Sequence, residues 1–332
     1  MHKFINNPEE VVNEMLQGIA AAHPKIVRLI EGTGCLIRSD APVKGKVGLV
    51  TGGGSGHEPA HGGYVGRGML DAAVAGNVFS SPPADQMYEA IKAAHGGAGV
   101  LCIIKNYTGD ILNFGVAREL AEMDDIQTDQ VVVNDDVAVQ NSLYTTGRRG
   151  VAGTVFVHKI AGAKADSGAS LAEVKAAAEK AINNVRTMGA ALTPCIIPSV
   201  GKPNFTLGEG EMEVGIGIHG EPGVERTAIM TADQTVDVLL QKILDDLPFV
   251  RGDRVAVMVN SMGATPAMEL YIVYNRVHKL LVERGISPRN VFVGEYMTSL
   301  EMTGLSISLM KLDDELESLL NAPAKTISWE SE

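Results

Sequence analysis

The sequence predicts an α/β protein of two domains, each with a mixed, mostly parallel sheet flanked by helices. Short apolar, β-branched segments alternate with segments of helical period, which is the pattern of a parallel sheet covered by helices. A length of 332 residues exceeds one typical core and suits two domains. Hydrophobic residues make up 45 % and charged residues 20 % of the chain, as in globular proteins that bury a large core.

The first half of the chain predicts strands and helices in alternation. Buried strands are expected in segments 46–54, which runs into a glycine turn, 99–110 and 129–136. Helices are expected at 82–97, which begins with proline and ends in glycine, and at 111–125. Ligands of such sheets gather in the loops beyond the carboxyl ends of the strands. The loops "TGGGSGHEP" and "KNYTGD" are therefore the first candidates for a binding site.

The second half restarts this alternation after a long connecting helix. Segment 169–192 has the longest helical pattern, and the glycine- and proline-rich segment 193–223 is expected to form strands joined by turns. The sequence then predicts helices at 232–247 and 265–285 and strands at 253–264, 290–297 and 304–312. We place the domain boundary near residue 185, within about ten residues, which gives domains 1–185 and 186–332.

Charge and cysteine content argue against several classes of function. The net charge of −12 provides no basic surface for nucleic acid and disfavours an anionic membrane. No apolar run approaches the roughly 18 residues that cross a bilayer, and acidic residues stand where a signal peptide would be apolar, so we expect a cytoplasmic protein. The cysteines, Cys35, Cys102 and Cys195, are far apart and fit no paired metal or redox motif.

The first glycine-rich loop does not match a phosphate-binding motif. A P-loop needs a lysine followed by Ser or Thr, and neither Lys46 nor Lys202 has one. A dinucleotide fingerprint would need glycine where His57 stands. The glycines are instead expected to let the backbone approach a small ligand and to hold His57 in an unusual turn. A histidine packed under the loop at the start of a helix fits this position equally well.

Polar residues near the predicted strand ends offer further candidates. Lys105 follows a buried strand, where an unpaired charge is costly, and this favours a functional role. Asp110 fits a catalytic carboxylate or, more commonly, the N-cap of the following helix. The acidic stretch 134–136 is interpreted as a solvated loop rather than a metal site. Arg148 and Arg149 are either a solvent-facing basic pair or a contact for a phosphate or a partner.

His219 is the most credible nucleophile in the chain. It stands at the end of a predicted alternating strand, and Gly217 and Gly220 leave its imidazole open. A neutral imidazole nitrogen with a free lone pair is a competent nucleophile. The sequence contains no Gly-x-Ser-x-Gly elbow and no reactive cysteine loop. The alternative is a half-buried histidine bonded to backbone.

Five motifs together resemble the K subunit of the dihydroxyacetone kinases. In chain order they read "GGGSGHEPAHGGYVG", "GNVFSSPPADQ", "KNYTGD", "GRRGVAGT" and "GIGIHGEPG". The resemblance extends over nearly the whole chain, and five motifs in one order make it specific. It implies that His219 forms a hemiaminal with the carbonyl carbon of the ketone and that His57 and Asp110 act as general acid and base groups. The substrate-binding residues that it implies are Gly54, Ser55, Gly56, His57, Lys105 and Asp110.

The resemblance also implies where the phosphoryl donor lies. This chain would carry no cofactor and no metal, while ADP and Mg²⁺ would sit on a separate helical L subunit that a phosphotransferase-system protein rephosphorylates from phosphoenolpyruvate. The C-terminal extension of one-chain, ATP-dependent members is expected to be absent. A homodimer is expected. Two alternatives stay open: a non-catalytic dihydroxyacetone sensor that acts as a transcriptional co-activator, and a kinase subunit for a larger ketose such as erythrulose.

Overall fold

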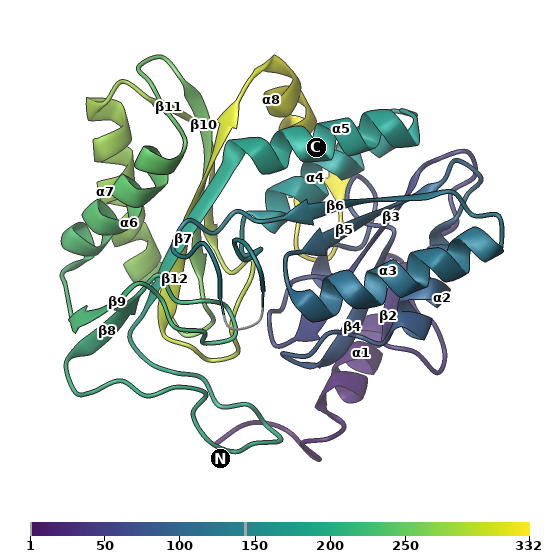
Figure 1. Cartoon of the computed structure of the whole chain (residues 1–332), viewed down its shortest axis with the longest axis horizontal. Coiled ribbons are helices and arrows are strands. Elements are labelled where there is room, and N and C mark those ends of the chain that lie inside the picture. Colours follow the sequence, from purple (N-terminus) through teal and green to yellow (C-terminus); the bar gives the residue numbers. More distant parts are fainter. Residues whose placement is uncertain (1, 143–144) are drawn as a thin grey trace.

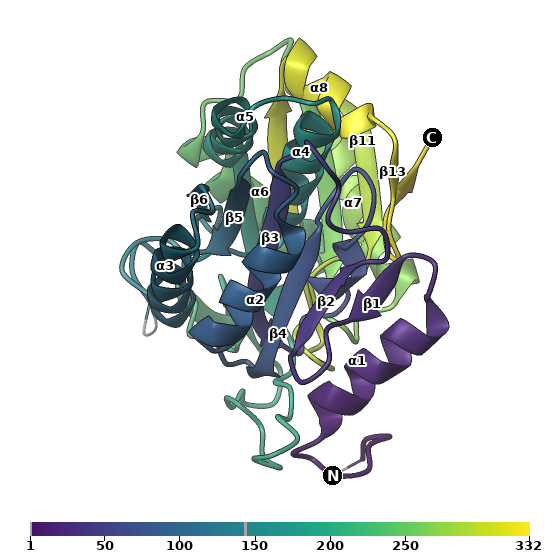
Figure 2. The same cartoon turned by 90° about the vertical axis from the view of Figure 1, so that its right-hand side faces the viewer.

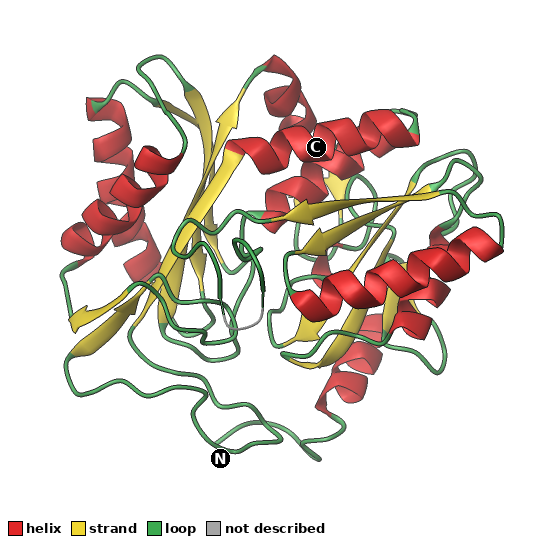
Figure 3. Cartoon of the chain, in the orientation of Figure 1, coloured by secondary structure: helices red, strands yellow, loops and turns green. Residues whose placement is uncertain are grey.

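The computed structural model of the chain describes residues 2–142 and 145–332. Two six-stranded sheets lie side by side, with helices between them and on their outer faces (Figures 1 and 3). This arrangement confirms the predicted α/β class with two mixed sheets. Within the described ranges, no helix is long and apolar enough to cross a membrane.

The first sheet has the strand order β1-β2-β4-β3-β5-β6. Its strands are β1 (Val27–Leu29), β2 (Cys35–Arg38), β3 (Gly48–Ser55), β4 (Ala72–Val78), β5 (Val100–Lys105) and β6 (Thr128–Val133). The strands from β4 to β6 are parallel neighbours, while β1 and β2 add an antiparallel edge. Helix α2 (Ala84–Ala94) connects β4 to β5 and helix α3 (Thr108–Met123) connects β5 to β6, because strands that run in parallel need a crossover connection. The carboxyl ends of β3, β4 and β5 therefore meet at one edge.

The second sheet has the strand order β11-β10-β12-β7-β8-β9. Its strands are β7 (Val185–Ala191), β8 (Glu211–Val214), β9 (Glu225–Ala228), β10 (Arg254–Ser261), β11 (Ser287–Gly294) and β12 (Gly304–Leu312). Only β10 and β11, which α7 (Ala267–Glu283) connects, pair in parallel. The other four pairs are antiparallel, unlike the mostly parallel sheet expected here. Loops rather than helices join β7 to β8 and β8 to β9, and antiparallel neighbours permit such loops.

A layer of helices separates the two sheets. Helix α4 (Thr154–Asp166) is buried around nearly its whole circumference, which is the pattern of a helix in the interior of a core. Helix α5 (Leu171–Asn184) packs beside it. Helices α6 (Ala232–Asp246) and α7 cover the outer face of the second sheet (Figure 1). The remaining helices are α1 (Val11–Ala22), α8 (Asp314–Asn321) and the short 3₁₀ helix η1 (Gly62–Tyr64).

The prediction of a single helix over 169–192 is correct only for the first part of that segment. A capping box of Ser170 and Glu173 starts α5, but the helix ends at Asn184 and β7 begins at the next residue. The run that follows contains β-branched residues and a glycine, which are weak helix formers, and it pairs on both sides with β12 and β8. Residue 185 therefore separates the strands of the two sheets, and the domain boundary at this position remains a prediction.

The largest apolar core does not follow that boundary. It joins residues of the first sheet, α4 and α5 to residues of β10 and β12 in the second sheet. The last segment of the chain also returns to the first half through β13 (Ala324–Lys325) and β14 (Glu330–Ser331), as Figure 2 shows in yellow beside the purple N-terminal elements. The Lys325 backbone N–H donates to the Arg67 carbonyl at 2.8 Å. The Trp329 ring packs 4.6 Å from the Phe292 ring centroid.

The segment 193–223 contains less regular structure than expected. Within it the structure has one strand, β8, and the rest is loop and turn. Three prolines, Pro194, Pro198 and Pro203, lack the N–H that a sheet ladder requires, which explains why the first part of the segment does not pair regularly.

Candidate active site

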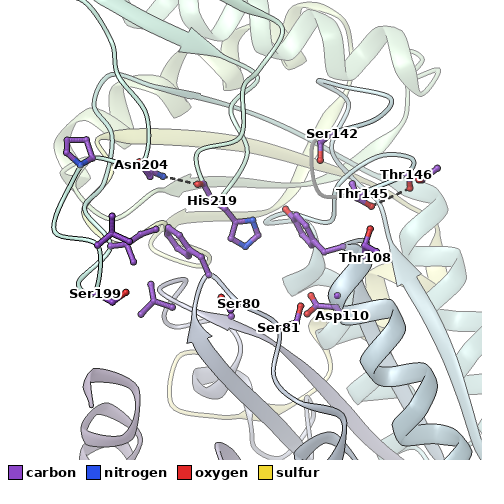
Figure 4. A pocket seen from close by; sticks show the side chains of 18 residues that line it. Ser80, Ser81, Thr108, Asp110, Ser142, Thr145, Thr146, Ser199, Asn204 and His219 are labelled. Carbon is purple, nitrogen blue, oxygen red and sulfur yellow. Dashed lines mark hydrogen bonds between the residues drawn. The ribbon is translucent and has the colours of Figure 1, made fainter. Parts of the chain in front are cut away.

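A cleft of about 1010 Å³ lies where loops of the second half face the carboxyl edge of the first sheet. The turn after β4, the first turn of α3 and the loops around residues 145, 200 and 219 form its walls (Figure 4). The lining residues are Gly54, Val78, Phe79, Ser80, Ser81, Tyr107, Thr108, Gly109, Asp110, Ser142, Thr145, Thr146, Ile197, Ser199, Val200, Pro203, Asn204 and His219. Three of the seven catalytic or substrate-binding residues that the sequence predicts, Gly54, Asp110 and His219, thus line one cleft.

His219 stands in a turn and not at the end of a strand. Strand β8 ends at Val214, and two glycines with positive φ, Gly215 (+80°) and Gly220 (+81°), shape the chain around the histidine. The side-chain amide of Asn204 donates to the His219 carbonyl at 2.8 Å. Figure 4 shows the imidazole pointing into the cleft, above Ser80, Ser81 and Asp110. The turn therefore presents the side chain to a ligand while the backbone is held.

The carboxylate of Glu221 fixes the tautomer of His219. One carboxylate oxygen accepts from the imidazole Nδ1–H at 2.8 Å, and the other accepts from the His219 backbone N–H at 2.8 Å. With the proton on Nδ1, the lone pair of Nε2 is available to the cleft. A Cβ on Gly217 would lie 2.1 Å from the Glu221 Oε2, so only glycine allows the carboxylate to reach this position.

Glu221 carries its negative charge although it is buried. Burial alone would favour the neutral acid, but His219, the hydrogen bond to it and the nearby Arg149 lower the Glu221 pKa to about 2. The Arg149 side chain is fully buried, forms an ion pair with Asp136 at 2.6 Å and donates to the carbonyl of Gly215 at 2.8 Å. Arg149 therefore stabilises the loop that carries His219 through its hydrogen bond to the backbone of Gly215.

For the charged residues near this loop, one prediction and one of two alternatives are wrong. The acidic stretch 134–136 is not solvated, because Asp135 and Asp136 are both buried. The Asp135 carboxylate accepts from the backbone N–H groups of Val151 and Gly153, each at 2.8 Å. Arg148 and Arg149 are not a solvent-facing pair, since Arg148 forms an ion pair with Asp246.

His57 lies directly behind His219. Its ring is fully buried, and the ring centroids of the two histidines are 4.8 Å apart. The His57 Nδ1–H donates to the Thr298 carbonyl at 2.8 Å, which leaves Nε2 as an acceptor without a partner among the described residues. Burial, together with the charges of Lys105 and His219, lowers the His57 pKa well below its usual value, so the ring is neutral at physiological pH.

Lys105 and Asp110 are both buried where β5 leads into α3. Lys105 is the last residue of β5, and Asp110 is the third residue of α3. The N-cap of α3 is Tyr107, so the interpretation of Asp110 as the helix cap is wrong. Burial raises the Asp110 pKa against the opposing effects of Lys105 and Ser81, and its Oδ1 has no partner in residues 2–142 and 145–332. A buried carboxylate of this kind can act as a general base.

The motif "GGGSGH" is mostly strand, not turn. Strand β3 continues to Ser55, and the loop begins at Gly56, whose φ is +98°. The Ser55 hydroxyl donates to the Gly76 carbonyl at 2.7 Å and is therefore engaged in the sheet. Ser55, Gly56, His57 and Lys105 do not line the cleft in this structure but lie in the layer behind it. Whether they contact substrate stays a prediction.

Sequence reasoning missed three residues that surround His219. Glu221, Phe79 and Tyr107 contact its imidazole, the two aromatic rings at centroid distances of 5.3 and 4.8 Å. All three stand inside motifs already singled out, but only their spatial contacts show their role. In the described part of the chain, no group of three or more His, Cys, Asp or Glu residues is arranged to hold a metal ion.

Comparisons with known proteins show the family to which the chain is similar. The Dak1 domain family matches residues 17–328. The PTS-dependent dihydroxyacetone kinase 1, dihydroxyacetone-binding subunit DhaK, of Listeria innocua is 55 % identical, over 99 % of this chain and 100 % of that protein. The DhaK subunit of Lactococcus lactis is 51 % identical, over 98 % of each chain.

Two solved structures resemble nearly the whole chain. One is the dihydroxyacetone kinase operon co-activator Dha-DhaQ, with a TM-score of 0.91, 35 % identity and coverage of 98 % of this chain and 99 % of that one. The other is the dihydroxyacetone kinase of C. freundii in complex with AMP-PNP and Mg²⁺, with a TM-score of 0.87 and 35 % identity. This match covers 99 % of the present chain but 61 % of the longer C. freundii chain.

Proposed function

Because the chain belongs to the Dak1 family, we propose that it is the dihydroxyacetone-binding catalytic subunit of a phosphotransferase-system-dependent dihydroxyacetone kinase. The observation that carries the proposal is the pairing of His219 with Glu221, which leaves a free imidazole nitrogen at the wall of the cleft. The DhaK relatives are dihydroxyacetone-binding subunits, which supports this choice of substrate. As the family resemblance implies, the proposal includes a cytoplasmic homodimer.

In the first step His219 adds to the ketone. The Nε2 lone pair forms a bond to the carbonyl carbon, and the π electrons of the C=O bond move to oxygen, which takes a proton from solvent. The imidazole becomes positively charged, and the Glu221 carboxylate stabilises this charge and can accept the Nδ1 proton. An alcohol such as glycerol cannot form this bond, so covalency supplies the selectivity between two ligands of similar size.

In the second step a hydroxyl of the bound ketone attacks the phosphoryl group. Its proton passes to Asp110 or His57, both of which are buried and have an atom without a partner among the described residues. A nucleoside triphosphate with Mg²⁺, held by an L subunit, would supply the phosphoryl group, and the nucleoside diphosphate would leave as its bond to that group breaks. The nucleotide complex of the longer C. freundii kinase and the failure of the glycine-rich loop to match a phosphate-binding motif support a donor site outside this chain.

A second candidate function is a ketone sensor, because the co-activator Dha-DhaQ has nearly the same fold. A sensor needs His219 and the cleft but no general base. The buried carboxylate of Asp110 and the neutral ring of His57 favour the enzyme. Burying such groups without full hydrogen bonding costs free energy, and a role in proton transfer accounts for that cost.

Reconstitution of the reaction tests the proposal. The purified chain with ATP, Mg²⁺ and dihydroxyacetone should form no dihydroxyacetone phosphate. Addition of the L subunit, ADP, the phosphotransferase proteins and phosphoenolpyruvate should give turnover, measured as product formed. Robust ATP-dependent phosphorylation by the chain alone would contradict the separate donor site. Ketone binding without turnover in the full system would favour the sensor.

Glu221→Gln should slow the capture of dihydroxyacetone about tenfold or more. The amide can still accept the Nδ1–H of His219, but it lacks the charge that stabilises the imidazolium, and hydrogen bonds to charged groups contribute about 1.5–3 kcal/mol. The measurement is the rate of adduct formation followed by stopped-flow calorimetry or mass spectrometry. Glu225→Gln, an exposed glutamate on β9, serves as the control. An unchanged rate in Glu221→Gln would show that the carboxylate only supports the loop.

A further inference from the structure

Phe79 has a backbone conformation that is unusual for an aromatic residue. It follows the last residue of β4 and has a φ of +58°. A side chain with a Cβ is strained in this left-handed region, and such strain is found most often at functional sites. The Phe79 N–H donates to the Ser55 carbonyl at 2.9 Å, which ties this position to the end of β3.

Two glycines of the first motif make room for Phe79. A Cβ on Gly54 would lie 2.7 Å from the Phe79 backbone, and a Cβ on Gly56 would lie 2.8 Å from the Phe79 ring. Neither glycine could be replaced without moving this residue. The glycine-rich motif, which does not fit a phosphate, therefore serves to bring one aromatic side chain close to β3.

The Phe79 ring contacts both histidines of the site. It stacks on His57 with a centroid distance of 5.1 Å and an interplanar angle of 20°, and it meets His219 at 5.3 Å and 77°. Tyr107 meets His219 at 4.8 Å and 83°. Two aromatic rings thus flank the nucleophile, and both line the cleft.

We propose that Phe79 determines which ketoses react, by excluding those with more than three carbons from the carbonyl site. This inference rests on the proposed function and deepens it. A ketone captured by His219 must place both carbonyl substituents beside the flanking rings. A hydroxymethyl group is small enough, whereas one further carbinol carbon would bring a hydroxyl against the Phe79 ring. That hydroxyl would lose water without gaining a hydrogen-bond partner, which is costly.

Binding of two ketones to the chain alone tests the inference. The dissociation constants of dihydroxyacetone and L-erythrulose are measured by isothermal titration calorimetry for the wild type and Phe79→Ala. The ratio of the erythrulose to the dihydroxyacetone constant should fall about tenfold or more in the variant, because one carbon at a fitted wall contributes about 10–200-fold. Intact mass after adduct trapping shows whether each ketone is bound to His219.

Two further variants keep the test decisive. Phe79→Leu retains an apolar side chain, and this fold tolerates leucine at positive φ, since Leu300 has a φ of +52°. It should shift the ratio in the same direction if Phe79→Ala does not fold. Val250→Ala changes an exposed apolar residue outside the cleft, where the side chain is 56 % exposed, and should leave the ratio unchanged.

The outcomes separate this inference from the proposed function. An unchanged ratio in folded Phe79 variants, or equal weakening of both ketones, would overturn the selectivity role while the function stands. Wild-type protein that binds neither ketone would overturn the function and the inference together. A lower ratio in the Phe79 variants with a wild-type ratio in Val250→Ala supports the inference.

Discussion

Replacement of His219 by alanine should weaken dihydroxyacetone binding at least about 100-fold. The ligand has few atoms, and each of its hydrogen bonds contributes only about 0.5–1.5 kcal/mol after exchange with water. The covalent bond to Nε2 is therefore the main source of affinity in the proposed mechanism. The dissociation constant is measured by calorimetry, and intact mass of the trapped wild type should show one ketone per chain on His219.

His278→Ala is a suitable control for this experiment. His278 lies on the outer side of α7, exposed and away from the cleft, so its loss should leave ketone binding unchanged. Wild-type protein should also fail to bind glycerol at concentrations that saturate the ketone site. Equal binding of dihydroxyacetone by wild type and His219→Ala would show that no covalent bond contributes.

Asp110→Asn should retain ketone binding, but its turnover number in the reconstituted system should fall about 10²–10⁴-fold. This is the usual contribution of a correctly placed general base. Asparagine has nearly the same shape, so the cleft should be preserved. Because Asp110 is not the cap of α3, the helix should keep its stability. The measurement is the turnover number at saturating ketone, with binding checked separately by calorimetry.

The pH profile adds a second readout for Asp110. The base must be ionised, and burial raises its pKa, so wild-type turnover should fall with decreasing pH already above the range of an exposed aspartate. The Glu221 pKa of about 2 keeps that carboxylate ionised throughout this interval. Asp110→Asn should lack this acidic limb.

Asp85→Asn provides a matched control. Asp85 also stands in the first turn of a helix, α2, but its side chain is exposed and lies outside the cleft. Its replacement should leave both turnover and pH profile unchanged. Near-normal turnover in Asp110→Asn would contradict its assignment as the base and leave His57 as the candidate.

Much of the fold could be predicted because local patterns and tertiary packing agree. The helix over 82–97 and the strand at 304–312 have clear start and stop signals, and the structure contains both as α2 and β12. β7 was missed because its residues continue the helical period of α5, and only pairing with β12 and β8 selects the strand. Glycine disfavours strands, so the continuation of β3 to Ser55 could not be predicted from residue preferences either.

The residues of the candidate site could likewise be predicted only in part. His219 and Asp110 could be singled out because their residue types and loop positions fit the chemistry, and the structure places both at one cleft. The roles of Glu221 and Arg149 depend on hydrogen bonds across a folded loop, and no spacing rule predicts these. Phe79 was missed for the same reason, since its contacts join three separate segments.

The contacts of residues 325–329 with the first half of the chain affect how the protein folds during synthesis. The Ser328 backbone N–H donates to the Gly63 carbonyl at 2.9 Å, next to the loop that carries His57, and the Trp329 side chain belongs to the main core. A ribosome delivers the N-terminal half first, and most domains fold as they emerge. Here the core that covers the first sheet is complete only after residues 325–329 have been synthesised. A nascent chain released early therefore exposes apolar surface, which makes it a target for chaperones and proteases.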